Sequence, residues 1–234
     1  MEYTCQRKLW RITMRMRRKK GLEERIENSN LLIPVGYEVM DARKAVAEKC
    51  YLDLDSLYKN KGELWLEIGC GKGSFAIKST KANPQIRYLA VEKLSNVIIS
   101  AVEKAEEEGI ENVRFISTGA EYLPRYLSPN SVSKIFINFP TPLPNSRTQR
   151  QRLTAPAFLE VYKNLLVQGG EIRFKTDKEF LYQYTLETMA QAGFEIVYQT
   201  ENLHQDKIPN IITEYEQKFT DQGFPIYSIH AKKI

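Results

Sequence analysis

The sequence is poor in the residues that build metal centres and disulfide frameworks. Its 234 residues include three cysteines, Cys5, Cys50 and Cys70, and two histidines, His204 and His230. No two cysteines have the C-x-x-C spacing of a zinc or redox motif, so we expect neither a bound metal nor a disulfide framework. A chain without disulfides suits a reducing compartment, and we therefore expect a cytoplasmic protein.

Long apolar runs are missing as well. No stretch approaches the roughly 20 apolar residues that a membrane helix needs, and the basic N-terminus is not followed by the apolar segment of a signal peptide. We therefore expect no membrane partner. Hydrophobic residues still make up 42% of the chain and aromatic residues 11%, which argues against disorder and predicts a packed core.

Acidic residues are scarce at the beginning of the chain. Residues 1–22 contain eight lysines and arginines and one acid, Glu2, whereas the whole chain has a net charge of +5. Such a segment attracts phosphate groups, and we interpret residues 1–30 as a flexible basic arm and residues 31–234 as the folded domain. A solvated tail is the alternative. The candidate backbone-binding residues of the arm are Arg15, Arg17, Arg18, Lys19 and Lys20.

The rest of the chain alternates between short apolar strands and helices, after an irregular or helical lead-in over residues 31–62. The expected strands are 64–69, 87–92, 112–117, 133–139, 171–176, 194–200 and 225–231, and the expected helices are 74–82, 94–108, 120–127, 155–166 and 178–192. This alternation predicts a Rossmann-like α/β fold, with a mostly parallel seven-stranded sheet and helices on both faces. Such sheets bind ligands at the carboxyl ends of the strands, where the strand order switches.

The first of these strands ends in a glycine-rich loop, Glu67-Ile-Gly-Cys-Gly-Lys-Gly73. Gly69, Gly71 and Gly73 let the backbone turn tightly and approach a ligand closely. The G-x-G-x-G spacing differs from the G-x-G-x-x-G of dinucleotide sites, and Glu67 would repel a pyrophosphate but attract a cation. A dehydrogenase site or a plain turn is the alternative.

Polar residues also follow the ends of the next three strands. Glu92, followed by Lys93, ends the second strand, where an acid can accept hydrogen bonds from both hydroxyls of a ribose. The third strand ends in Ser117-Thr-Gly-Ala-Glu121, which should face an adenine, and the fourth ends at Asn138, which should border the reacting group. A cationic ligand with a free ribose and no phosphate describes S-adenosylmethionine, which we expect as the cofactor. The candidate cofactor-binding residues are Glu67, Gly69, Gly71, Gly73, Glu92, Lys93, Gly119, Ala120, Glu121 and Asn138.

Several segments together resemble the bacterial tRNA (guanine-N7)-methyltransferases. They are MRMRRKK from Met14, LEIGCGKGSF, the N-F-x-x-P-x-P loop with RQRL after it, GGEIRFKTD and TEYEQKF, so the similarity runs from about Met14 to the C-terminus. The resemblance implies a class I methyltransferase fold and S-adenosylmethionine as the donor. It also implies methylation of N7 of guanine 46, in the variable loop of tRNA.

The resemblance also implies roles for individual residues. Glu67 and Glu92 would hold the donor, and Asp177 would contact the substrate. A second substrate segment would be formed by Thr213, Glu214, Tyr215 and Glu216. Local roles are compatible alternatives, since Asp177 is a favoured helix N-cap and Thr213 with Glu216 fits a capping box. Tyr215 and Phe219 lie four apart on one helix face, so we expect them in the core rather than stacked on a base.

The loop after the fourth strand departs from the family's pattern. Where the family has Asp-Pro-Trp-Pro-Lys, this chain has Thr141, Leu143 and Asn145 at the Asp, Trp and Lys positions, and Gly119 replaces the usual adenine-edge Asp. The loop instead carries Arg147, Arg150 and Arg152, which we interpret as a tRNA-backbone patch; a solvated loop is the alternative.

Methyl transfer to guanine N7 needs no general base, because N7 of neutral guanine is already an unprotonated acceptor. Losing the loop acid should therefore slow the reaction rather than abolish it. No residue is a certain catalyst; Asn138 and Asp177 are the best candidates. A tRNA-binding paralogue with weak or no methyl transfer is the second hypothesis, and a small-molecule methyltransferase is the third. A monomer and a homodimer both fit the sequence.

Overall fold

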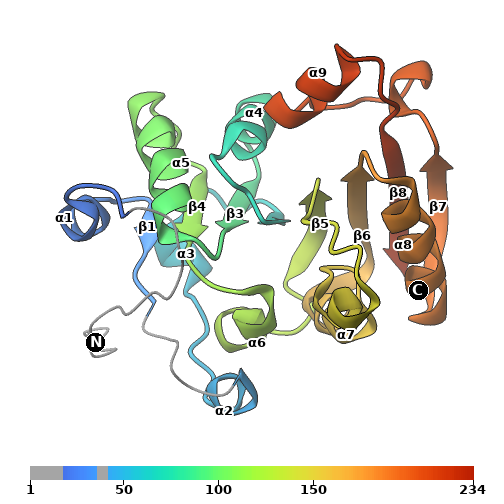
Figure 1. The fold of residues 1–234 in the computed structure, drawn as a ribbon. Helices are drawn as coiled ribbons and strands as arrows, with labels where there is room; N and C mark the ends of the chain where they lie inside the picture. The colour runs from blue at the N-terminus through green and yellow to red at the C-terminus, as the bar shows by residue number, and fades with distance from the viewer. Residues whose placement is uncertain (1–17, 36–41) are drawn as a thin grey trace.

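We analysed a computed structural model of the chain, which describes residues 18–35 and 42–234. Strands and helices alternate along most of it (Figure 1). The strands are β1 (Leu32–Ile33), β2 (Leu64–Ile68), β3 (Arg87–Val91), β4 (Val113–Ile116), β5 (Val132–Asn138), β6 (Leu166–Thr176), β7 (Phe194–Thr200) and β8 (Tyr227–Lys233). The α-helices are α1 (Leu22–Glu27), α2 (Ala42–Ala47), α3 (Leu54–Leu57), α4 (Ser74–Ala82), α5 (Ser95–Glu107), α6 (Leu123–Tyr126), α7 (Pro156–Leu165), α8 (Glu179–Gln191) and α9 (Glu214–Thr220), and the 3₁₀ turns are η1 (Ala120–Tyr122), η2 (Ser146–Gln151) and η3 (Leu203–Gln205).

The eight strands form one sheet in the order β1-β4-β3-β2-β5-β6-β8-β7. Strands β1 to β6 pair in parallel, and β8 is antiparallel to both β6 and β7. The Rossmann-like α/β fold is thus confirmed, but the expected count of seven strands is wrong. The extra strand, β1, has two residues inside the stretch that we read as a lead-in, and two residues are too few to show strand periodicity.

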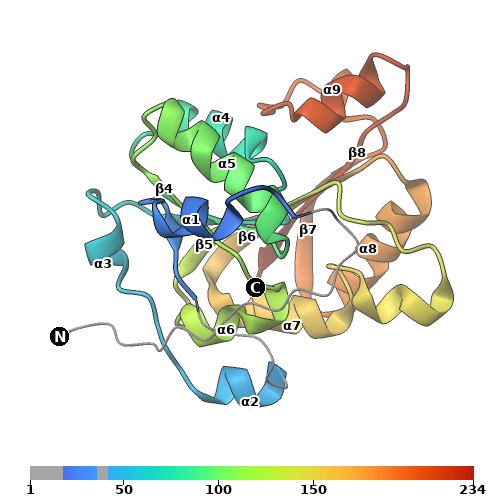
Figure 2. The same cartoon turned by 60° about the vertical axis from the view of Figure 1, so that its left-hand side comes forward.

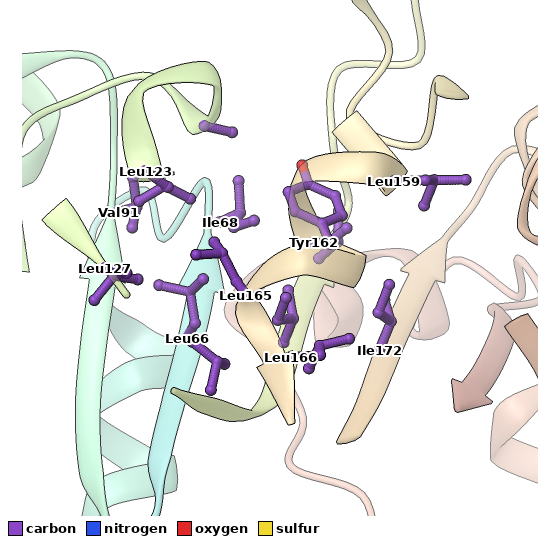
Figure 3. Packing of buried hydrophobic residues seen from close by; sticks show 14 of the residues in the cluster. Leu66, Ile68, Val91, Leu123, Leu127, Leu159, Tyr162, Leu165, Leu166 and Ile172 are labelled. Carbon is purple, nitrogen blue, oxygen red and sulfur yellow. The ribbon is translucent and has the colours of Figure 1, made fainter. Parts of the chain in front are cut away.

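Helices cover both faces of the sheet (Figures 1 and 2). On one face α6, α7 and α8 pack on β2, β5, β6 and β8, and on the other α4 and α5 pack on β3 and β4. Figure 3 shows the first of these clusters, where Leu66 and Ile68 of β2 gather with Leu123 and Tyr162 from the covering helices. Leu66, Leu123 and Tyr162 are completely buried. Each such side chain contributes about 1.5–3 kcal/mol on burial, so the strands around β2 form a rigid base for the site.

The strand order reverses between β2 and β5. From β2 the chain proceeds outward through β3 and β4, and it then returns to add β5 and β6 on the other side of β2. At such a reversal the connections leave in opposite directions, so the carboxyl ends of β2 and β5 bound a crevice. Figures 1 and 2 show that α9 lies above these strand ends, outside both helical layers.

The described part of the basic arm is folded against α5. Leu22 of α1 is buried, and Arg25 donates two hydrogen bonds of 2.6 Å to the carboxylate of Glu103. The Lys19 backbone N–H donates to Asn96 at 3.0 Å. The described residues of the arm thus contact α5 through both polar and apolar side chains. Of the arm's backbone-binding candidates, Arg15 and Arg17 lie outside the described residues, while Arg18 and Lys20 are exposed.

Within residues 18–35 and 42–234, no helix combines the length and the apolar character that a membrane crossing requires. The same part of the chain contains no group of three or more His, Cys, Asp or Glu residues arranged to hold a metal ion. Cys50 and Cys70 are free thiols.

Candidate active site at the carboxyl ends of β2 and β5

A pocket of about 400 Å³ opens at the carboxyl ends of β2 and β5. It brings together three parts of the chain that are distant in sequence: the glycine loop after β2, the end of β5 and the beginning of α9. Its lining residues are Glu67, Gly69, Cys70, Gly71, Lys72, Ser74, Phe75, Asn138, Phe139, Thr213, Glu214 and Tyr215. Four predicted cofactor residues and three predicted substrate residues thus share one cavity.

The glycine loop turns into the pocket by using conformations that favour glycine. Gly69 and Gly71 have φ angles of +79° and +56°, and a Cβ at either position would meet nothing within 4 Å. The backbone is therefore open to a ligand at both residues. Gly73 has a different role from the predicted cofactor contact, because a Cβ there would lie 2.6 Å from that of Ala101. It is needed for the close packing of α4 on α5.

Glu67 is a buried acid at the end of β2. Its Oε2 accepts a hydrogen bond from the Tyr88 hydroxyl at 3.2 Å, and its Oε1 accepts one from the Asn138 amide at 3.2 Å. Burial raises the pKa of Glu67 to about 7, against the opposing effect of these hydrogen bonds and of Lys175. A carboxylate kept from water in this way gains from a cationic partner.

Asn138 lines the same cavity. Its Nδ2 is held by Glu67, whereas its Oδ1 is buried and accepts no hydrogen bond from the described residues. An unsatisfied buried acceptor is costly, and a ligand that supplies an N–H group removes that cost. With the Glu67 carboxylate beside it, Asn138 completes an acceptor pair suited to an ammonium group.

Glu92 lies at the end of β3 and supports the glycine loop. Its Oε2 accepts a hydrogen bond from the Gly71 N–H at 3.3 Å, and its Oε1 accepts one from the Leu94 N–H at 3.0 Å. A ligand with vicinal hydroxyls would compete for the same oxygens. Glu92 does not line the pocket itself, but it contacts Gly71, which does.

The predicted adenine-edge residues follow β4, two strands away from β2. Gly119 and Ala120 are buried there. A Cβ on Gly119 would lie 2.4 Å from a carboxylate oxygen of Glu121. The missing side chain at 119 thus leaves room for the acid of Glu121, which lies 3.9 Å from the ammonium of the exposed Lys93.

Asp177 follows β6, with a side chain that is only 6% exposed. Its Oδ2 contacts the Lys178 ammonium at 2.7 Å and has no other partner among the described residues. The expected N-cap role is wrong, since α8 begins after Lys178 and has no side-chain cap. The Lys178 ammonium that pairs with Asp177 also lies 5.7 Å from the ring centroid of Phe219, so this acid lies near α9. The Asp177 carboxylate accordingly adds to burial in raising the pKa of Tyr215.

The capping box predicted for α9 is confirmed. Thr213 accepts a hydrogen bond from the Glu216 N–H at 2.9 Å, and the Glu216 carboxylate accepts one from the Thr213 N–H at 3.3 Å. Glu216 is completely buried and also pairs with Lys175 at 2.9 Å. Its oxygens are occupied within the protein, so the structure does not present Glu216 to a substrate.

Tyr215 was expected in the core but is 44% exposed. Its ring stacks on Phe219, with centroids 4.4 Å apart, and contacts the ring of Phe139, with centroids 4.9 Å apart. The expectation failed because α9 stands outside the layers that form the core. The i, i+4 pair therefore forms an aromatic surface at the pocket mouth.

The proline-rich loop between β5 and η2 is held by a buried arginine. Arg152 is 6% exposed, and its Nε and Nη2 donate to the Leu143 carbonyl oxygen at 3.2 and 3.1 Å. Its guanidinium lies 4.4 Å from the ring centroid of Tyr184. Arg152 therefore does not belong to the predicted phosphate-binding patch, whereas Arg147 and Arg150 are exposed as that patch requires.

We expect Arg152→Met to lower the free energy of unfolding by about 2 kcal/mol, because the variant loses hydrogen bonds from a charged donor. The largest change in backbone conformation is expected at Leu143, since its φ of +45° is strained for a leucine and its carbonyl is held by Arg152. Urea unfolding measures the change. The exposed Arg150→Met is the matched control, with an expected effect below about 0.5 kcal/mol. Equal losses in the two variants would contradict this role for Arg152.

Several pocket residues were missed in the sequence. Phe75 and Lys72 carry no recognised signal beyond their place after the glycine loop, and Phe139 looked like the last residue of a strand. Phe139 instead has a φ of +49° and leaves the sheet to line the pocket. The buried Lys175 behind the pocket was likewise assigned no role, although its place next to the core residue Phe174 in β6 puts it on the opposite face of the sheet.

Comparison with known proteins identifies the family and the fold of the chain. A family model described as a putative methyltransferase matches residues 61–229. The fold is similar to that of the 16S rRNA methyltransferase KamB, with a TM-score of 0.60 and 14% identity over 79% of this chain and 94% of that one. It is also similar to a SAM-dependent methyltransferase from Aquifex aeolicus, with a TM-score of 0.53 and 15% identity over 83% and 100% of the two chains.

A third similar structure is the geranyl diphosphate C-methyltransferase from Streptomyces coelicolor A3(2), in complex with Mg²⁺, geranyl diphosphate and S-adenosyl-L-homocysteine. Its TM-score is 0.53, with 16% identity over 77% of each chain. These similarities establish a class I methyltransferase fold. Two of these enzymes are named for different substrates, 16S rRNA and geranyl diphosphate, so the shared fold does not by itself determine the substrate.

Proposed function

This chain belongs to the putative methyltransferase family that matches residues 61–229, and we propose that it transfers a methyl group from S-adenosylmethionine to N7 of a guanine in the variable loop of tRNA. The observation that carries the proposal is the acceptor pair of Glu67 and Asn138 at the strand-order reversal. One oxygen of that pair is buried and lacks a donor. An amino acid ammonium is the group that satisfies both residues.

Residues of the pocket and of the neighbouring strand ends would together hold the cofactor. Glu67 and Asn138 would hold its amino end, Glu92 would accept hydrogen bonds from the ribose hydroxyls, and Gly69 and Gly71 would let the backbone approach it. The segment from Gly119 to Glu121 would border the adenine. When bound, S-adenosylmethionine supplies an electrophilic methyl group on a sulfonium centre.

The acceptor atom, guanine N7, needs no activation by the protein. Guanine N7 attacks as a free lone pair, so the site must position the base and support the positive charge that the base acquires. Asp177 provides a carboxylate beside the α9 wall, and a carboxylate can accept from both N1–H and the exocyclic amine of guanine. Tyr215 offers an exposed ring on which a base can stack.

The exposed arginines support an RNA substrate. Arg147 and Arg150 follow the loop that borders the pocket, and their side chains reach solvent. Phosphate contacts of this kind orient an RNA without reading its sequence. A small-molecule methyltransferase would have no use for them, which disfavours that hypothesis.

One observation favours the second hypothesis, a protein that binds tRNA without efficient transfer. The position at which the resembled family has an acid is the exposed Thr141, and Asn145 is occupied in accepting a hydrogen bond from the Arg147 N–H at 2.9 Å. Neither residue supplies a charge to the reaction.

Single-turnover methylation separates the two hypotheses. Excess protein is mixed with an unmodified tRNA transcript and labelled S-adenosylmethionine, and the nucleosides are then separated by mass spectrometry. We expect 7-methylguanosine from one guanine of the variable loop, and none from a transcript in which that guanine is adenine. Salt-sensitive binding of the transcript without any product would select the second hypothesis.

The raised pKa of Glu67 makes cofactor affinity depend on pH. Since the pKa is about 7 and an ammonium needs the ionised carboxylate, affinity for S-adenosylhomocysteine should rise about tenfold between pH 6 and pH 8. Isothermal calorimetry measures this change. The isosteric Glu67→Gln should bind weakly, without this dependence, and an equal pH profile in both proteins would assign the titration elsewhere.

Glu67 should also make the stability of the protein depend on pH, but stability should fall as the pH rises, whereas cofactor affinity increases. Its pKa is raised from 4.5 to about 7 in the folded protein, so its contribution to stability is complete below pH 4.5 and is lost as the pH rises to 7. Above pH 7 the contribution is absent.

A further inference from the structure

A buried ion pair lies directly behind the pocket. The Lys175 ammonium is 2.9 Å from the Glu216 carboxylate, and the two side chains are 9% and 0% exposed. Lys175 also donates to the Asn210 side chain at 2.5 Å and to the Ile211 carbonyl at 3.0 Å. Three acceptors match the three donors of an ammonium group, so the lysine is fully satisfied in this position.

Lys175 is connected to all three walls of the pocket, directly or through Glu216. Its backbone carbonyl accepts a hydrogen bond from the Phe139 N–H at 2.8 Å, which fixes the wall at the end of β5. Its ammonium lies 5.4 Å from the ring centroid of Phe75, on the glycine-loop side. Through Glu216 it holds the third wall, α9.

Glu216 also binds several residues of the segment that leads into α9. Its Oε1 accepts from the Asn210 amide at 2.6 Å, and its Oε2 accepts from the Thr213 N–H at 3.3 Å. His204 lies 3.3 Å from the same carboxylate. Residues 210–216 are therefore bound to the end of β6 by one carboxylate and one ammonium.

Helix α9 has few other means of attachment. It stands outside both helical layers (Figures 1 and 2), and its seven residues bury one side chain, that of Glu216. Its other polar ties among the described residues are exposed ones. They run from Lys78 to the Ile212 carbonyl at 2.7 Å, from Lys104 to Glu214 at 3.5 Å and between Thr220 Oγ1 and His204 Nε2 at 2.9 Å, and the Lys178 ammonium lies 5.7 Å from the Phe219 ring centroid. Exposed ties of this kind contribute little.

We propose that Lys175 is a positioning residue, which acts through Glu216 to hold the Thr213–Tyr215 wall in the place where RNA must meet the cofactor. The inference rests on the proposed function for its substrate. It also changes the role of Glu216, which would orient the substrate segment from behind rather than touch the base. Lys175 also lowers the pKa of Glu67, so the comparison is made at a pH where Glu67 is ionised in both proteins. There, replacing Lys175 should affect RNA use more than cofactor binding, because the glycine loop and Glu92 are held by other elements.

The test begins with Lys175→Met. We expect kcat/KM for tRNA to fall roughly 10- to 100-fold, the size of effect that a small misplacement produces, while the affinity for S-adenosylhomocysteine changes far less. Hydrogen exchange should accelerate at the amides of residues 210–217. Unchanged kcat/KM together with unchanged exchange would overturn the proposal.

A second variant separates positioning from stability. Lys175→Met alone leaves the buried charge of Glu216 unpaired, whereas adding Glu216→Gln removes that charge and keeps the capping geometry. We expect the double variant to regain melting temperature without regaining kcat/KM. Recovery of both would show that the pair serves only stability, and would overturn the proposal.

The matched control is Lys134→Met. Lys134 is a half-buried lysine on the same face of the sheet, 3.9 Å from Glu171, and it does not line the pocket. It should lose stability without a change in kcat/KM or in the exchange of residues 210–217. If wild-type protein methylates no RNA, the proposed function fails, and the exchange and calorimetric measurements still decide whether Lys175 holds α9.

Discussion

Asp177→Asn should lower kcat/KM for tRNA methylation by about 10²- to 10³-fold and leave the affinity for S-adenosylhomocysteine unchanged. The substitution keeps the size of the side chain and removes its charge. A group that supports charge only as the reaction proceeds typically has an effect of this size on the rate. This is the largest effect on catalysis that we expect from any single residue of the described site.

The reason lies in the burial of Asp177. Its side chain is 6% exposed, and Lys178, 43% exposed, is the partner of its Oδ2. A carboxylate so shielded from water acts strongly on a neighbouring cation. Guanine becomes a cation when N7 accepts the methyl group, so the interaction strengthens toward the transition state and appears in kcat as well as KM.

Steady-state kinetics with a tRNA transcript and calorimetry with S-adenosylhomocysteine test the prediction together. Glu179→Gln is the matched control, because Glu179 is an exposed acid two residues further along the chain, and it should retain activity. A parallel loss of cofactor affinity in Asp177→Asn would place Asp177 in the donor site instead. An Asp177→Asn variant with wild-type kinetics would remove it from the mechanism.

Glu67→Gln should weaken S-adenosylhomocysteine binding by about 100-fold at pH 8, where the wild-type carboxylate is ionised. The amide keeps an acceptor for the Tyr88 hydroxyl but cannot pair with an ammonium group. Losing a charge-assisted hydrogen bond together with its ion pair is worth roughly 3 kcal/mol in a buried site, which corresponds to that factor.

Calorimetry measures this loss directly, with Glu63→Gln as the control. Glu63 precedes the same strand but is exposed and accepts a hydrogen bond from Trp65 at its far end. Binding by Glu63→Gln should match wild type. Wild-type affinity in Glu67→Gln would mean that the pocket does not receive the ammonium end of the cofactor.

The fold was accessible from the sequence because its signals are local and repeated. Apolar runs such as LWLEI end at glycines, and the helix expected over 94–108 is found as Ser95–Glu107, just before Gly109. The strand-order reversal then brought Glu67 and Asn138 together without any further information. Strand β1 was missed because its two residues are defined by pairing with β4 rather than by their own pattern.

The site was less accessible, because side-chain burial depends on tertiary packing. Arg152 and Arg150 are two residues apart and equal in charge, yet one is buried under the loop and the other reaches solvent. Glu216 and Tyr215 are adjacent, and the structure exchanges their expected environments: the acid is buried and the ring is exposed. The environments of Glu216 and Tyr215 do not follow from residue type, since both depend on how α9 is positioned over the end of β6.

The cap that Asn145 provides makes positions 141 and 145 of the loop unequal in their structural roles. Its side chain begins η2 by accepting from the Arg147 N–H, and exchanging such a cap for another residue costs about 1 kcal/mol. Position 141 is exposed and Thr141 has no such capping role. Asn145→Lys should therefore cost more stability than Thr141→Asp, because only the first substitution removes a cap.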